Sequence, residues 1–96
     1  SGRESIRVPE NSAESGRIEA SPDGGFVAAE VTFRDNDALP ERGVIVFDLA
    51  RGTQWTYGWR YGGEAEPVSW NLESAGVLAV KIPGATHRFD ATGRKL

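Results

Sequence analysis

Several short runs of the chain alternate apolar and polar positions with a period of two, and turn residues separate these runs. On residues 26–33, four apolar side chains fall on one side of a strand, namely Val27, Ala29, Val31 and Phe33. Ala28, Glu30 and Thr32 fall on the other side. This alternation is typical of a half-buried antiparallel strand, so we expect the first set to face the core. Helical spacing is almost absent, and the pattern therefore predicts an all-β fold, an antiparallel meander of short strands.

The same pattern predicts the other elements of one small domain over residues 17–96. Further strands are expected at residues 17–20, 44–49, 53–61, 68–72, 77–82 and 87–91. Two of them carry apolar faces, formed by Ile45, Phe47 and Leu49 and by Val68, Trp70 and Leu72. Residues 1–16 are interpreted as a flexible segment or an edge strand, and residues 94–96 as the start of a last strand.

A row of four aromatic residues is the most unusual local feature. It consists of Trp55, Tyr57, Trp59 and Tyr61, which alternate strictly and so project from one face of a strand. Two interpretations are open. In a domain this small the row is most simply part of the hydrophobic core beneath a facing sheet. Alternatively it is a stacking platform for sugars or an anchor for a partner protein, with Arg60 on the opposite face.

The chain also contains a degenerate internal repeat. Residues 25–31 are echoed by residues 76–82, and residues 46–52 by residues 88–94. The two units cover residues 17–61 and 67–96, and they differ mainly in the polar loop at residues 34–43. We therefore expect a duplicated antiparallel hairpin with the aromatic strand between its copies.

Short motifs in both units resemble a known family. They are Ser21-Pro22-Asp23-Gly24 before a Phe-Val-Ala-Ala strand, Val46-Phe47-Asp48-Leu49 before a glycine turn, and Pro67-Val68-Ser69-Trp70 opening the second unit. Over residues 18–96 the series resembles the WD-repeat-like blades of bacterial Tol-type periplasmic β-propellers, and this resemblance implies a periplasmic or secreted location.

The chain departs from the blade pattern in two ways. The second unit has Asn71-Leu72-Glu73-Ser74 where such blades usually carry Pro-Asp-Gly, and fewer than two blades are present where a closed propeller has four to eight. Two arrangements are therefore open. The two units close on themselves as a small sandwich, or several copies complete a ring.

Composition narrows the function classes. The net charge is −3, from 11 basic and 14 acidic residues, which argues against a nucleic-acid-binding surface because such a surface needs a basic stripe. No apolar stretch approaches the roughly 20 residues that span a bilayer. The sequence has no cysteine, so disulfides and thiolate metal sites are excluded.

Candidate chemistry is sparse, and we expect no cofactor and no metal. Asp35, Asn36, Asp37 and Glu41 gather oxygen ligands in one loop, but they lack the spacing of a calcium loop, so a solvated loop is favoured. Asp48 and Asp90 shortly precede glycine turns and are interpreted as caps of turn amides. His87 is the only histidine.

These observations predict a non-catalytic module that binds another protein, as a recognition, inhibitor or assembly domain. The candidate contact residues are Trp55, Tyr57, Trp59, Tyr61, Asp35, Asn36, Asp37 and Arg60. The alternatives are a carbohydrate-binding protein that uses the aromatic row and a structural part of a larger propeller. Self-association is a further expectation, because repeat units need neighbours to cover their apolar faces.

Overall fold

The computed structural model describes residues 12–33, 42–60 and 62–96, and this part of the chain is all-β. Its elements are β1 (Ser12–Ala20), β2 (Phe26–Phe33), β3 (Arg42–Asp48), β4 (Thr53–Trp59), β5 (Ser69–Leu72), a 3₁₀ turn η1 (Ser74–Gly76), β6 (Leu78–Ile82) and β7 (Ala85–Phe89). The expected fold class is therefore confirmed.

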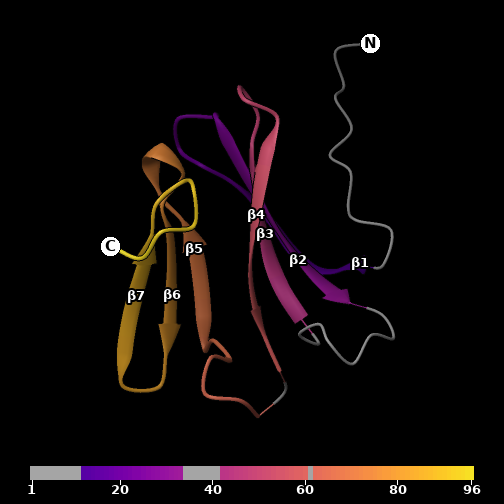
Figure 1. The fold of residues 1–96 in the computed structure, drawn as a ribbon, viewed down its shortest axis with the longest axis vertical. Coiled ribbons are helices and arrows are strands. Elements are labelled where there is room, and N and C mark those ends of the chain that lie inside the picture. Colours follow the sequence, from indigo (N-terminus) through magenta and orange to yellow (C-terminus); the bar gives the residue numbers. More distant parts are fainter. Residues whose placement is uncertain (1–11, 34–41, 61) are drawn as a thin grey trace.

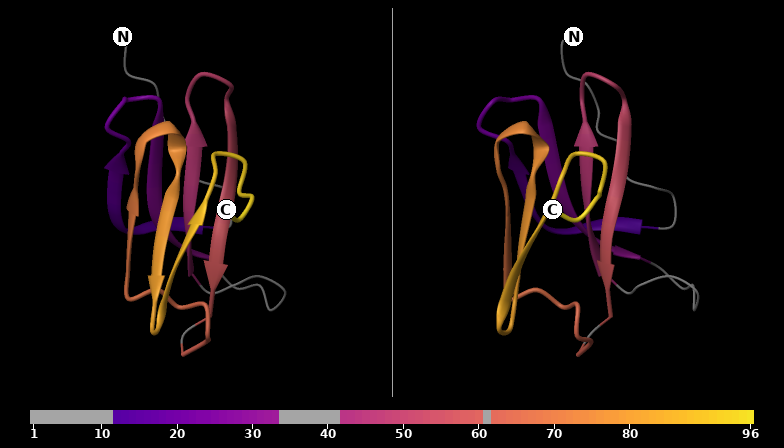
Figure 2. Two further views of the ribbon diagram at one scale, coloured as in Figure 1. Left: turned by 90° about the vertical axis from the view of Figure 1, so that its left-hand side faces the viewer. Right: turned by 60° about the vertical axis from the view of Figure 1, so that its left-hand side comes forward.

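The strands form two antiparallel sheets that follow the order of the chain. Sheet A has the order β1-β2-β3-β4 and sheet B the order β5-β6-β7. The two sheets lie as separate layers beside each other, with β5 to β7 in one layer and β1 to β4 in the other (Figures 1 and 2). A turn-rich connection after β4 carries the chain from one layer to the other.

Several strand bounds differ from those expected. Residues 26–33 were predicted correctly. β1 begins at Ser12, earlier than the predicted 17–20, because its first residues pair with the end of β2 across an irregularity between Glu14 and Ile18. β4 ends at Trp59, and Tyr61 lies outside the described residues. At residues 94–96 the structure has a single bridge, between Phe89 and Lys95.

The main core lies between the two sheets. Its buried members come from both layers and are Ala28, Val44, Val46, Trp59, Trp70, Leu72, Leu78 and Val80. Trp55 and Tyr57 pack against it, and both rings contact Phe89 of β7, with centroid separations of 5.6 and 5.4 Å. Aromatic side chains of β4 thus hold the two sheets together.

Both faces of the middle strands of sheet A are buried, and this corrects one expectation. Ala29, Val31, Ile45 and Phe47 form a second buried cluster on the face turned away from sheet B. The opposite side of β2, expected to be the polar one, packs towards sheet B, where Ala28 belongs to the inter-sheet core and Glu30 bonds to Trp70. Period two separates two sides of a strand, but it does not say which side meets the other layer.

Two residues expected on apolar faces are exposed. Leu49 follows the end of β3 in a turn and is 48% exposed, and Val68 precedes β5 and is 66% exposed. Each lies one position outside its strand, so the alternation that fixes the inward face of the strand no longer positions its side chain.

The turn at Ser21-Pro22-Asp23-Gly24 forms as expected and also reaches the second sheet. Gly24 has a φ of 78°, and its N–H donates to the Ser21 carbonyl at 2.9 Å. The Asp23 carboxylate accepts from the Ser21 hydroxyl and the Gly25 amide, and its second oxygen accepts from the Ala75 amide of η1 at 3.0 Å. One carboxylate therefore holds this turn and links it to the turn between β5 and β6.

Candidate functional site

Side chains of β1 bond to the outward edge of β5 where the two sheets approach each other. Arg17 donates to the Trp70 carbonyl, and the Leu72 amide donates to Glu19 at 2.6 Å. The guanidinium carbon of Arg17 lies 4.1 Å from the centre of the Trp70 ring, close enough for a cation–π contact. The Arg17 side chain is still 49% exposed, so its guanidinium is fixed by these contacts and also accessible to solvent.

Glu30 lies beside Arg17 and Trp70, and its hydrogen bonds connect β2 with β3 and β5. One carboxylate oxygen accepts from the Trp70 indole N–H at 3.0 Å, and the other accepts from the Arg42 guanidinium. The Glu30 side chain is 20% exposed and that of Arg42 is 23% exposed, so the ion pair is largely shielded from water. Charge-assisted hydrogen bonds of this kind are stronger than neutral ones.

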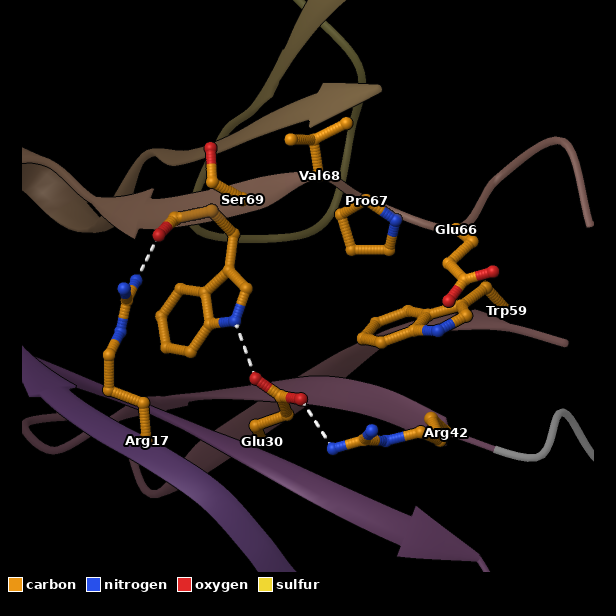
Figure 3. A pocket seen from close by; sticks show the side chains of 9 residues that line it. Arg17, Glu30, Arg42, Trp59, Glu66, Pro67, Val68 and Ser69 are labelled. Carbon is orange, nitrogen blue, oxygen red and sulfur yellow. Dashed lines mark hydrogen bonds and ion pairs between the residues drawn. The ribbon is translucent and has the colours of Figure 1, made fainter. Parts of the chain in front are cut away.

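A cleft opens between the sheets at this network. Its cavity measures about 230 Å³, and its lining includes Arg17, Glu30, Arg42, Trp59 and Trp70 together with residues 66–69. In Figure 3 Glu30 and Arg42 lie on the side of sheet A, and Pro67, Val68 and Ser69 lie across from them.

A second, more open groove adjoins the cleft. It has a volume of about 510 Å³ and is lined by Gly62, Gly63, Glu64, Glu66, Pro67, Val68, Ile82 and Pro83. Glu66, Pro67 and Val68 line both hollows. We call the cleft and the groove together the cleft surface. It combines a stacked guanidinium with exposed aliphatic and proline side chains.

The aromatic row lies mainly under sheet B. Trp59 is 5% exposed, and Trp55 and Tyr57 are half-buried. The Tyr57 hydroxyl donates to the Ala65 carbonyl at 2.8 Å, and burial raises the pKa of Tyr57. Of the two interpretations of this row, core packing describes these three side chains, and only Trp59 also lines the cleft.

Of the other predicted site residues, the structure describes only Arg60. Arg60 is exposed just after β4. The acidic loop with Asp35, Asn36, Asp37 and Glu41 lies outside the described residues, and so does Tyr61.

Both aspartates expected to cap turns do so. The Asp48 carboxylate accepts from the amides of Ala50 and Arg51 at 3.1 and 3.2 Å. Asp90 accepts from the Thr92 hydroxyl and from the amides of Thr92 and Arg94, and the bond from the Thr92 hydroxyl contributes most to lowering the pKa of Asp90. These carboxylates stabilise turns.

The described ranges hold no group of three or more His, Cys, Asp and Glu side chains placed to bind a metal ion. The same ranges contain no helix with the length and apolarity needed to cross a bilayer. No protein-family model matches the chain, and no curated protein or solved structure is significantly similar to it.

Sequence reasoning missed the residues that shape the cleft, namely Arg17, Glu30, Arg42 and Trp70. One signal was available. Phe26 and Ala28 share a side of the strand with Glu30, so this side was partly apolar and Glu30 was a charge among apolar neighbours. Such a charge usually has a partner when it is shielded from water.

Proposed function

We propose that the chain is a non-catalytic protein-binding module and that the cleft surface is its contact site. The observation that carries the proposal is Val68, which lines both hollows and is 66% exposed. An aliphatic side chain between two hollows, with a held cation nearby, suits a partner segment better than a small polar ligand.

The chemistry of the cleft surface suggests what the partner segment carries. The Arg17 guanidinium is fixed by stacking on Trp70, so less side-chain entropy is lost when it binds a carboxylate. Ile82, Pro67 and Pro83 give the groove an apolar wall. We therefore expect an extended segment in which an aliphatic side chain lies near an Asp or Glu.

The hydrogen bonds of two carboxylates, Glu30 and Asp48, favour a binding role over a catalytic one. Glu30 is held between Trp70 and Arg42, and Asp48 holds turn amides. A general acid or base must reach a substrate proton, whereas these oxygens accept hydrogen bonds that stabilise the fold.

A selection from a phage-displayed library of random peptides tests the proposal. Peptides enriched on the native protein should bind Val68→Ser and Arg17→Ala at least tenfold more weakly. The matched controls are Leu49→Ser, also at an exposed aliphatic, and Arg51→Ala, at an arginine 76% exposed. Enriched peptides that bind the Val68 and Arg17 variants as well as the native protein, or no enrichment at all, would refute this site.

A second candidate, a structural part of a larger propeller, is supported by the topology of sheet A. Its four antiparallel strands follow the chain order β1-β2-β3-β4, and a propeller blade is a four-stranded sheet. Light scattering tests this candidate: three or more copies per particle support a completed ring, and a smaller particle counts against one.

A further inference from the structure

Sheet edges expose unpaired backbone N–H and C=O groups, and proteins normally block them. Two edges of sheet B are blocked from within the chain. At the β5 edge the Arg17 and Glu19 side chains bond to the backbone of Trp70 and Leu72. At the β7 edge the Leu96 amide donates to the Arg88 carbonyl at 2.8 Å, and the Asp90 amide donates to the Arg94 carbonyl at 2.9 Å.

The β1 edge of sheet A is protected in a different way. Its pairing with β2 is interrupted between Glu14 and Ile18, and Arg17 and Glu19 place charges along it. Bulges and charged side chains are the common devices that stop another strand from adding to a sheet. Three of the four edges therefore carry a visible device.

Among the described residues, the β4 edge carries none of these devices. β4 runs over seven residues, Thr53–Trp59, with no charged side chain and no proline. Its pairing with β3 is continuous from Thr53 to Trp59, without a bulge. Within the described ranges β3 is its only strand neighbour. A regular, uncharged edge of this length is a template for another strand.

We infer that two copies of the chain associate through this edge, with β4 pairing antiparallel to β4 of the second copy about a two-fold axis at Thr56. In this register the side chains of β4 are compatible with those of β4 in the second copy. Trp55 lies opposite Tyr57 and Thr56 opposite Thr56, and aromatic and threonine pairs are favourable across strands. No like charges meet, and a two-fold contact closes at two copies.

The two copies would form one continuous eight-stranded sheet from two sheets A. The exposed side chains of Gln54 and Thr56 lie on the strand that pairs, and neither has a charge to desolvate. Apart from Trp59, the residues of the cleft surface lie outside β4, so this inference does not rest on the proposed partner binding.

A thiol placed on the axis tests the register, since the chain has no cysteine of its own. Directly opposed residues of antiparallel strands have Cα atoms about 4.5–5.5 Å apart, which a disulfide can bridge. Thr56→Cys should therefore give a covalent dimer on mild oxidation. Thr53→Cys is the matched control on the same strand, because its two copies would lie about 20 Å apart.

Light scattering of the unmodified chain at high concentration should give twice the 10.4 kDa of one chain. Thr56→Lys should be a monomer with an unchanged circular dichroism spectrum, because two ammonium groups would meet at the axis. Thr86→Lys, at an exposed position of β7, should leave the dimer intact. If the native chain is a monomer at all concentrations, β4 does not pair with a second copy and the inference is wrong. Equal cross-linking of the Thr56 and Thr53 variants also overturns it.

Discussion

Glu30 and Trp70 join the two sheets through one hydrogen bond of 3.0 Å between residues 40 positions apart in the sequence. The bond fixes the indole over which Arg17 stacks, and the second Glu30 oxygen fixes Arg42. A single carboxylate therefore orders both sides of the cleft, and its removal should affect stability and cleft shape together.

Glu30→Ala should lower the free energy of unfolding by about 1–3 kcal/mol, because it removes the carboxylate that accepts hydrogen bonds from a shielded indole N–H and from a shielded guanidinium. Glu73→Ala is the matched control. Its carboxylate pairs with Arg88 at 3.1 Å, but the two side chains are 34% and 51% exposed, so a loss of about 0–1 kcal/mol is expected. Urea unfolding measures both, and equal losses would contradict the role given to Glu30.

Asp23 should make the protein sensitive to acid. Hydrogen bonds from the Ser21 hydroxyl and from the amides of Ala75 and Gly25 lower the pKa of Asp23 from 3.8 to about 2. A lowered pKa stabilises the fold above the unfolded value of 3.8, and this contribution is lost as the pH falls towards 2. Asp23→Asn should therefore lose less stability than the native protein between about pH 4 and pH 2.

The measurement is urea unfolding at a series of pH values. Glu64→Gln, a change at an exposed carboxylate of the groove, serves as the control and should follow the native curve. Asp90, whose pKa is also lowered, is present in all three proteins, so the difference between the curves isolates Asp23. Coincident curves for Asp23→Asn and the native protein would argue against this linkage.

Gly76→Ala should destabilise the fold through backbone strain and through a steric clash. Comparison with Gly84, where only the backbone strain arises, separates the two effects. The φ of Gly76 is 76°, and an added Cβ would lie 2.6 Å from Cδ2 of Phe26. Gly84 has a φ of 87° but no heavy atom within 4 Å of the same position. Gly84→Ala should therefore cost only the backbone strain of about 1–2 kcal/mol. Gly76→Ala should cost about 1–3 kcal/mol more through overpacking against Phe26. Thermal unfolding of the pair measures the difference.

Local chemistry in the sequence predicted the turns and several strands well. A proline, an aspartate and a glycine in succession fix the conformation at residues 21–24, because each acts on its nearest backbone atoms. Strict alternation likewise placed Trp55, Tyr57 and Trp59 on one face of β4. These features depend on residues that are close in sequence.

The cleft could not be predicted in this way. The contact between Arg17 and Trp70 joins residues 53 positions apart and depends on how the two sheets stack, which no local pattern encodes. The sequence did not determine which side of β2 faces sheet B, because Ala28 and Ala29 point to opposite sides of the strand and both are buried. Only the stacking of the layers decides between them.

Tryptophan fluorescence should separate the packed aromatic row from an exposed sugar platform. The three tryptophans are Trp55, Trp59 and Trp70, and the last two are 5% exposed. Acrylamide, a neutral quencher, should therefore quench the native protein weakly, and a mixture of glycans should leave the spectrum unchanged. Arg17→Ala should increase the quenching, because it uncovers one face of the Trp70 ring, whereas Arg51→Ala should not. Strong quenching of the native protein together with a spectral response to glycans would favour carbohydrate binding over the packing described for β4.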